Sequence, residues 1–343
     1  MPNQPDNFHI PIIFSSNNYY VPYMAVTLQS VMENAVPNRK YILFIFHREI
    51  TNDNIDLLKK QVSFFPHFSI EFINVNQYIN KYDLFVSRHI TVEAYFRLLI
   101  PELLSEYPKA IYLDSDMICC TDIASLYDIN LKNNLIAAVR DIGVAWYYSP
   151  NHSEYINTFY SVLLNLKNPD EYFCDGMCVF NIELFRKTIS TDKLFELAAS
   201  REWQVHDQDV LNYLCEGKTL LLPYHWNLMV TPNEKYLPEH LQTEYNKAKI
   251  NPKIVHYKPW NCENYILHFE LFWKYATRTP FISTIIERMK SKDFISNESF
   301  IERIISNIMY RKSIGLRFIL FDCLKAWLLR IKPQKKIKSK SDT

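Results

Sequence analysis

The feature that most constrains the fold is an alternation of two kinds of segment along the first part of this 343-residue chain. Short apolar runs rich in β-branched and aromatic residues are each followed by a stretch with helical spacing. This pattern is typical of βα units wound into a mostly parallel sheet. The expected strands are 9–15, 41–46, 68–73, 110–113 and 135–139, and the expected helices are 24–34, 52–62 and 92–104.

The pattern continues less regularly beyond residue 140. We expect a strand at 177–182, a helix at 183–200, a further helix starting at Asp207 and a short strand at 253–257. No low-complexity linker or repeat interrupts residues 9–275, so this part of the chain is expected to form one α/β domain.

The strand expected at 110–113 ends in Asp114-Ser115-Asp116. Two carboxylates this close raise the cost of ionising each other, and a hard divalent cation such as Mg²⁺ or Mn²⁺ removes that cost. At the carboxyl end of a central strand, both acids can point into the crevice where open α/β sheets bind ligands. The alternative is a solvated turn, since Asp and Ser are common turn residues.

Glycine is scarce, and its scarcity excludes two kinds of nucleotide site. The four glycines are too far apart to form a Gly-x-Gly-x-x-Gly dinucleotide fingerprint or a Walker phosphate loop. A phosphorylated ligand would therefore need a metal ion or basic side chains to neutralise its charge. This favours the metal interpretation of Asp114 and Asp116.

The cysteines and the first residues indicate the cellular compartment. The seven cysteines show no zinc-site spacing, and the start of the chain has neither the basic nor the apolar region of a secretory leader. We therefore expect reduced thiols and a cytoplasmic protein.

The end of the chain differs from the rest in charge. From residue 311 onward, ten Lys and Arg residues accompany only two Asp residues, and residues 300–331 have amphipathic helical patterns. Charged residues interrupt any window long enough to span a bilayer. We expect residues 276–343 to form a helical, basic tail that lies on an anionic membrane surface. The alternative is a helix that packs on the preceding domain.

Four further stretches carry reactive or charged side chains. Arg97 lies on the helix before the acid pair, Asp175-Gly176 interrupts an apolar run, residues 206–209 read His-Asp-Gln-Asp, and residues 256–260 read His-Tyr-Lys-Pro-Trp. Each alone has a structural explanation, such as a surface cation, an N-cap or a core histidine. Together with Phe-Ser-Ser-Asn-Asn-Tyr-Tyr at 14–20, they make the chain resemble glycosyltransferase family 8 over about residues 10–260. The resemblance is strongest to the bacterial lipopolysaccharide galactosyl- and glucosyltransferases.

This resemblance implies a GT-A-like nucleotide-sugar-binding fold within residues 1–275. It implies that Asp114, Asp116 and His256 ligate Mn²⁺, or Mg²⁺, and that the ion bridges the diphosphate of UDP-galactose or UDP-glucose. Carboxylate and imidazole together suit Mn²⁺, and a departing UDP needs its negative charge held. The further substrate-binding residues implied by the family are Ser15, Ser16, Asn17, Tyr19, Tyr20, Arg97, Ser115, Asp141, Asp175, Gly176, Asp207 and Lys258.

The family retains the anomeric configuration, and the catalytic residues that the resemblance implies are Asp141, Asp207, Gln208 and Asp209. The position matching a nucleophile is occupied here by Gln208. An amide carbonyl stabilises an oxocarbenium-like centre but is a poor nucleophile. We therefore expect front-face transfer, in which the leaving phosphate oxygen helps deprotonate the acceptor hydroxyl, with Asp209 as the fallback nucleophile. The expected acceptor is a saccharide or lipid-linked saccharide of a lipopolysaccharide or lipooligosaccharide core, at the inner face of the cytoplasmic membrane.

The chain departs from the family pattern at three places, and two other functions remain open. The departures are Asn17-Asn18 in place of an acid, Cys174-Asp175 before the glycine, and a spacing of only two residues between His256 and Lys258. The alternatives are a phosphatase of the haloacid dehalogenase class and a non-catalytic carbohydrate- or membrane-binding module. Nucleic acid is not an expected partner, because the basic residues gather in the tail without interleaved aromatics.

Overall fold

The computed structural model describes residues 9–86, 91–148, 160, 164–229, 231–257 and 267–291. The chain divides into two compact units, 1–286 and 287–343, and only the first few residues of the second are described. The expected membrane-associating tail lies, from residue 292 on, outside the described residues. Our boundary after residue 275 and the role of the tail stay predictions. In the described part, every helix is too short or too polar to cross a bilayer.

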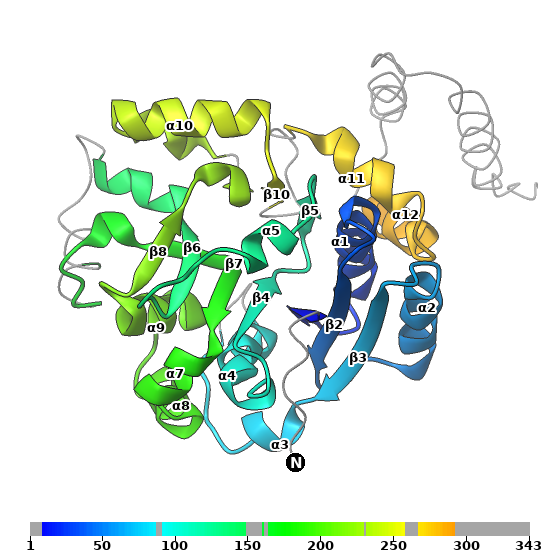
Figure 1. The fold of residues 1–343 in the computed structure, drawn as a ribbon, viewed down its shortest axis with the longest axis horizontal. Coiled ribbons are helices and arrows are strands. Elements are labelled where there is room, and N and C mark those ends of the chain that lie inside the picture. The colour runs from blue at the N-terminus through cyan, green and yellow to red at the C-terminus, as the bar shows by residue number, and fades with distance from the viewer. Residues whose placement is uncertain are drawn as a thin grey trace, which may run out of the picture. The chain divides into compact units, whose positions relative to one another are not determined.

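A seven-stranded sheet forms the centre of the first unit (Figure 1). Its strand order is β3-β2-β1-β4-β7-β6-β8, and only β7 runs antiparallel to its neighbours. The mostly parallel α/β sheet expected from the alternating pattern is therefore confirmed. The strands are β1 His9–Ser15, β2 Lys40–His47, β3 Phe68–Asn74, β4 Lys109–Leu113, β6 Ile136–Arg140, β7 Phe173–Asn181 and β8 Thr219–Leu222.

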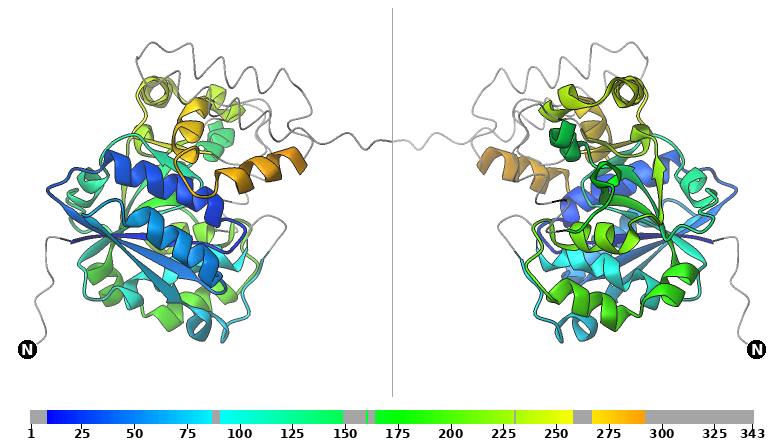
Figure 2. Two further views of the ribbon diagram at one scale, coloured as in Figure 1. Left: turned by 90° about the vertical axis from the view of Figure 1, so that its right-hand side faces the viewer. Right: turned by 90° about the vertical axis from the view of Figure 1, so that its left-hand side faces the viewer.

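Helices cover both faces of this sheet, as the edge-on views of Figure 2 show. Because side chains alternate along a strand, Ile12 of β1 packs in the core beneath α1 and α2, whereas Ile13 packs in the opposite core. The first face is covered by α1 Val21–Asn34 and α2 Asn52–Val62. The second face is covered by η1 Val92–Leu99, α4 Ile100–Leu103, α7 Ile182–Thr188, α8 Thr191–Ala199 and α9 His206–Cys215.

The structure differs from the sequence-based expectation in two helical regions. The helix expected at 92–104 begins as the 3₁₀ helix η1 and continues only briefly as α4. The helix expected at 183–200 is two helices, because Ile189 has an extended backbone and the Ser190 hydroxyl accepts a hydrogen bond from the Lys193 amide. Serine at this position caps a new helix rather than continuing the old one.

The strand expected at 177–182 is longer than predicted, since β7 begins at Phe173 and includes Asp175 and Gly176. These two residues belong to a β-bulge: Ala138 pairs with Cys178, but the next residue, Val139, pairs with Cys174. A bulge bends a strand and redirects its side chains, and bulges are common beside active sites.

A second, three-stranded sheet lies next to the end of β4. Its order is β5-β10-β9, with β5 Met117–Cys119, β9 Leu228–Met229 and β10 Ile254–His256. The remaining described elements are α3 Asn76–Ile79, α5 Ala124–Tyr127, η2 Ile142–Tyr148, η4 Pro169–Glu171, η5 Tyr224–Trp226, η6 Pro232–Tyr236, α10 Glu239–Ile250, α11 Phe269–Ala276 and α12 Ile282–Ser291.

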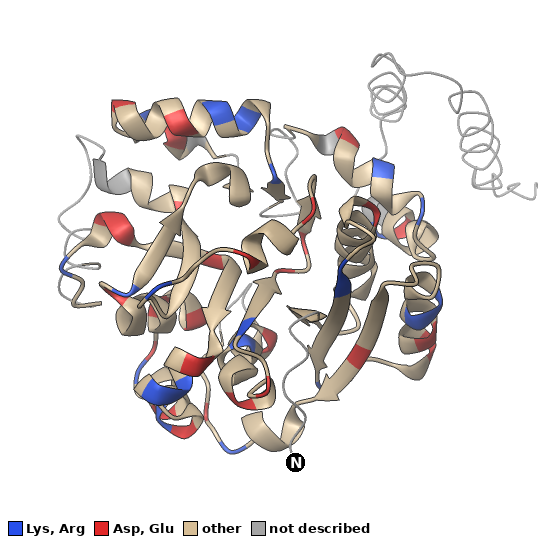
Figure 3. Ribbon diagram, viewed as in Figure 1, with Lys and Arg blue, Asp and Glu red and all other residues tan. Residues whose placement is uncertain are grey.

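Acidic and basic residues are mixed over the described elements (Figure 3). Helix α10, for example, carries Glu239 and Glu244 as well as Lys247 and Lys249. The excess of positive charge from residue 311 onward lies outside the described residues.

Candidate functional site

The Asp-Ser-Asp turn leaves the carboxyl end of β4, the middle strand of the large sheet. Its Ser115 is only 7% exposed, so the turn is not the solvated one that we kept as an alternative. The Ser115 hydroxyl donates to the carbonyl of Ser15, and the Ser115 carbonyl accepts from the hydroxyl of Thr27 on α1. These bonds fix the turn, and Asp114 and Asp116 project from it.

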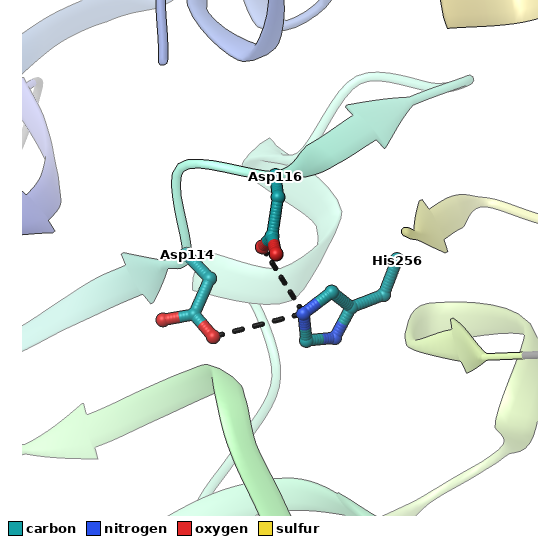
Figure 4. Close-up of side chains that lie close together, drawn as sticks. All are labelled: Asp114, Asp116 and His256. Atoms are coloured by element: carbon teal, nitrogen blue, oxygen red, sulfur yellow. Dashed lines mark ion pairs between the residues drawn. The ribbon is translucent and has the colours of Figure 1, made fainter. Parts of the chain in front are cut away.

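His256, at the end of β10, faces both carboxylates (Figure 4). Its Nε2 atom lies 3.2 Å from Asp116 Oδ1 and 3.7 Å from Asp114 Oδ2. The meeting follows from strand pairing, because His256 is opposite Met117 in the antiparallel pair of β10 and β5, and the Tyr257 amide donates to the Asp116 carbonyl. We call Asp114, Asp116 and His256 the acid–imidazole cluster.

The acid–imidazole cluster fits a divalent cation. One ligand atom from each residue lies within 4.8 Å of the others. Asp116 Oδ1 is buried and accepts no hydrogen bond from the described residues. A buried carboxylate oxygen without a hydrogen bond destabilises the folded protein unless a cation or a protonated partner faces it. Carboxylate oxygens with one imidazole nitrogen form a donor set that Mn²⁺, and more generally borderline divalent ions, accept.

Gly176 in the β7 bulge makes room for the cluster. A Cβ atom at this position would lie 2.5 Å from His256 Cε1 and 2.7 Å from Asp114 Oδ2. The backbone is held in place by a hydrogen bond of 2.7 Å from the Asp114 amide to the Gly176 carbonyl. Glycine is therefore required here for close approach rather than for its backbone angles.

Arg97, expected on a helix before the acid pair, is buried and binds three acids. Its guanidinium lies 3.0 Å from Asp114 Oδ1, 3.0 Å from Asp175 Oδ1 and 2.8 Å from Asp207 Oδ2. It also lies over the ring of Tyr112, 4.2 Å from the centroid. Arg97, Asp175 and Asp207 are the Arg97 cluster, and Asp114 links this cluster to the acid–imidazole cluster.

Burial and charge oppose each other in the Arg97 cluster. Burial alone would lower the pKa of Arg97, but the attraction of Asp175 and Asp207 holds that pKa well above its usual value. Burial raises the pKa of Asp175 well above its usual value, with Arg97 opposing the rise and Asp207 adding to it. One guanidinium therefore does not fully neutralise the acids around it.

Gln208, the expected catalytic amide, is held by two acceptors. Its Nε2 donates to Asp141 Oδ2 at 2.9 Å and to the Tyr172 hydroxyl at 3.1 Å. A carboxylate can only accept, so the amide nitrogen must face Asp141. The Tyr172 hydroxyl then donates its own proton to Asp209 Oδ1 at 2.6 Å, and the amide of Asp175 donates to Gln208 Oε1 at 3.4 Å.

Asp209, the fallback nucleophile, is completely buried. Besides the bond from Tyr172, its second oxygen accepts from the Val205 amide at 2.8 Å. Both oxygens therefore accept hydrogen bonds, one from Tyr172 and one from the start of α9, which gives no support to a nucleophilic role. That role stays a prediction.

Asn17 and Asn18, which depart from the family pattern, have different tasks. Asn17 Oδ1 accepts from the Tyr20 amide and shapes the loop before α1. Asn18 binds the chain segment before α2, since its Nδ2 donates to the Glu49 carbonyl and its Oδ1 accepts from the Thr51 amide. The substitution at Asn18 is thus structural, and Asn17 is the residue that shapes the expected uridine loop.

This loop carries two aromatic residues and follows Ser15, whose carbonyl accepts from Ser115 of the Asp-Ser-Asp turn. Tyr19 and Tyr20 are edge-to-face with ring centroids 5.5 Å apart, and Tyr19 is 47% exposed. Burial, followed by the charge of Asp116, raises the pKa of Tyr20. Ser16 is buried, and its amide donates to the Phe46 carbonyl at the end of β2.

Of the expected site residues, only Lys258 falls outside the described residues. Two residues that support the cluster, Thr27 and Asn227, were not predicted from the sequence. Thr27 bridges α1 to the Asp-Ser-Asp turn, and Asn227 Oδ1 lies 2.9 Å from His256 Nδ1. In the sequence, each is only a polar residue within an apolar stretch, and such a pattern does not by itself indicate a functional site.

The fold and this geometry define an α/β protein with a candidate divalent-cation site at the carboxyl edge of a mostly parallel sheet. A profile described as glycosyl transferase family 8 matches residues 11–263. The chain therefore belongs to glycosyl transferase family 8, as its motifs suggested.

Among curated proteins, the chain is similar to general stress protein A of Bacillus subtilis (strain 168). The two are 26% identical over 287 residues, covering 78% of this chain and 93% of that protein. It is 28% identical over 275 residues to glycosyltransferase GlyF of Streptococcus pneumoniae serotype 4, covering 77% of this chain and 60% of GlyF. It is also 24% identical over 234 residues to lipopolysaccharide 1,2-glucosyltransferase of Escherichia coli (strain K12), covering 63% and 65%.

Two solved structures share the fold. The apo structure of the bifunctional glycosyltransferase WbbM has a TM-score of 0.73 and 25% identity, and the match covers 83% of this chain and 52% of WbbM. The galactosyltransferase LgtC, in complex with donor and acceptor sugar analogs, has a TM-score of 0.64 and 21% identity, covering 79% and 96%. The chain thus spans nearly all of LgtC but about half of WbbM.

Proposed function

We propose that the chain is a retaining hexosyltransferase that moves a sugar from a UDP-sugar to a saccharide acceptor, in lipopolysaccharide or lipooligosaccharide core synthesis. The observation that carries the proposal is the convergence of Asp114, Asp116 and His256 at the carboxyl end of the central strand in a family 8 chain. The phosphatase alternative has no such support, because the matching family consists of glycosyl transferases.

The acid–imidazole cluster would hold Mn²⁺, or Mg²⁺, which when bound supplies positive charge for the diphosphate of the donor. The chain lacks glycine-rich phosphate loops, so this charge would have to come from such an ion and from basic side chains. Lys258 is the expected second cation. Tyr19 and Tyr20 offer rings against which a uracil base can stack, next to the same acids.

The chain's own residues would then position the sugar. Arg97 holds Asp175 and Asp207, whose oxygens accept hydrogen bonds of the kind that sugar hydroxyls donate. Asp141 and Tyr172 take up both amide protons of Gln208, so the carbonyl oxygen is the end that can face a developing positive charge. This arrangement suits front-face transfer, in which a carbonyl stabilises the sugar without attacking it.

The similarity to a lipopolysaccharide glucosyltransferase favours a lipid-linked saccharide as the acceptor. Such an acceptor lies at the membrane surface, and the basic residues from 311 onward would bring the enzyme to anionic lipid at the inner face of the cytoplasmic membrane.

The test is to incubate the full chain with UDP-galactose, UDP-glucose and UDP-N-acetylglucosamine, each with Mn²⁺ and with EDTA, and to measure UDP release. We expect Mn²⁺-dependent release from one hexose donor and its loss in Asp116→Asn. An Asp192→Asn variant, altered at an exposed acid on α8, is the matched control and should keep the activity. Release of phosphate from small phosphomonoesters with no turnover of any UDP-sugar would refute the proposal.

A further inference from the structure

We propose that Asn227 is a positioning residue that fixes His256 in the one tautomer that a cation can bind. The inference rests on the proposed metal-dependent function and adds a residue to it. Asn227 is 2% exposed, and its Oδ1 lies 2.9 Å from His256 Nδ1. It comes from the segment between η5 and β9, which the sequence did not single out.

This contact determines which ring nitrogen of His256 carries the proton. A neutral imidazole carries one proton, on Nδ1 or on Nε2, and the other nitrogen keeps the lone pair. A carbonyl oxygen can only accept, so Asn227 Oδ1 places the proton on His256 Nδ1. The lone pair is then on Nε2, the atom that faces Asp116 Oδ1 at 3.2 Å and Asp114 Oδ2 at 3.7 Å. The opposite tautomer would present a proton, and no cation could bind there.

The amide of Asn227 is used at one end only. Its Nδ2 atom is buried, and no acceptor among the described residues bonds to it. The oxygen is therefore the functional end of this side chain. A carboxylate of the same shape should replace it, whereas an apolar side chain of similar size should not.

The backbone holds Asn227 at the required place. Strand β9 pairs in parallel with β10, with Leu228 opposite Val255 and Met229 opposite His256. The Asn227 amide donates to the Tyr224 carbonyl, and the Tyr224 amide donates to Glu244 on α10. Helix α10 and the small sheet thus support the residue that orients the histidine. Such partners of metal-bound histidines typically change metal affinity by 10- to 100-fold.

The experiment titrates Mn²⁺ calorimetrically into the full chain and three variants. Asn227→Leu should lower Mn²⁺ affinity by about 10- to 100-fold, and Asn227→Asp should keep it within about threefold of the wild type. Asn181→Ala, which removes the side chain that accepts from the Leu184 amide at the start of α7, controls for general destabilisation and should leave the affinity unchanged. Equal affinities in wild type and Asn227→Leu would overturn the proposal, and so would equal losses in the Leu and Asp variants.

Nitrogen NMR of the metal-free protein, at a pH where the imidazole is neutral, tests the same inference without metal. We expect the proton on Nδ1 of His256 in the wild type and in Asn227→Asp, and a shift toward Nε2 in Asn227→Leu. A proton on Nε2 in the wild type would overturn the proposal. A wild type that binds no Mn²⁺ would instead refute the proposed function, and the NMR result would still decide the role of Asn227.

Discussion

Two groups of acids meet at Asp114, and they balance their charge in different ways. In the Arg97 cluster, a buried guanidinium contacts Asp175, Asp207 and Asp114 itself, so the counter-charge belongs to the chain. In the acid–imidazole cluster, Asp116 faces only a histidine among the described ion pairs, and one of its oxygens accepts no hydrogen bond there.

This difference separates acids whose counter-charge the chain itself supplies from acids that need a cation from outside. Buried charges that are paired within the chain serve the folded state, and removing one partner is costly. A carboxylate such as Asp116, which has no guanidinium or ammonium group beside it among the described ion pairs, favours a cation supplied from outside.

The largest effect is expected from Arg97→Met, which keeps an unbranched side chain over Tyr112 but removes the charge. The buried Asp175 and Asp207 and the partly buried Asp114 then lose their counter-charge, and the free energy of unfolding should fall by about 3–5 kcal/mol in urea titrations. Arg39→Met, which removes an exposed pair with Asp128, is the control and should cost under about 1 kcal/mol. Similar losses in the two variants would contradict a structural role for the Arg97 cluster.

The two aspartates of the turn should have similar effects on metal affinity but different effects on stability. Asp116→Asn and Asp114→Asn should each lower Mn²⁺ affinity by more than about 100-fold, beyond the loss typical of an outer partner. Only Asp114→Asn should also lower the free energy of unfolding in EDTA, by about 1.5–3 kcal/mol, because Asp114 accepts from Arg97 and Tyr112. If Asp116→Asn destabilised the metal-free protein as much, the distinction between the clusters would fail.

Gly176→Ala tests the close packing around the acid–imidazole cluster. The added methyl group would meet His256 and Asp114 at distances that no Cβ tolerates, so one of them must move. Mn²⁺ affinity should fall by about 10- to 100-fold, as it does when metal ligands lose their orientation. Gly217→Ala is the control: Gly217 has a φ of +68° and open space around it, so alanine there should cost stability but not metal affinity.

The smallest effect concerns the surplus negative charge of the Arg97 cluster. Because burial raises the pKa of Asp175 in the folded state, folding favours the protonated form. The stability that this proton provides is lost as pH rises from the unfolded pKa through the folded one. Asp175→Asn mimics the protonated form and should raise the free energy of unfolding at pH 8 by on the order of 1 kcal/mol. The gain should shrink as pH falls toward 4, and a constant gain across this range would argue against the titration of Asp175.

Much of this arrangement could be predicted from the sequence, and the reason is local. The apolar run 109–113 followed by two acids indicated a strand that ends at a ligand site. The alternation of apolar and helical segments indicated a parallel sheet, in which this strand is the middle one. His256 is distant in the sequence and Arg97 lies on a separate predicted helix, and only the resemblance to a family pattern connected them to the acids.

The remaining features depend on pairing between distant segments. The bulge that brings Gly176 against the cluster arises from the register of β7 with β6, which no local pattern encodes. The same holds for Asn227, whose partner His256 is brought to it by the pairing of β9 and β10. Thr27 appears as an ordinary helix residue until the turn of β4 is placed beside it.

The central claim is that Asp114, Asp116 and His256 bind a cation that the chain needs in order to hold a uridine diphosphate. Calorimetric titration of UDP into the full chain, with Mn²⁺ and then with EDTA, tests it most directly. We expect UDP to bind at least about tenfold more tightly with Mn²⁺, a difference of about 1.4 kcal/mol, and this gain to vanish in Asp116→Asn. Equal UDP affinity with and without the metal, or an undiminished gain in the variant, would contradict the claim.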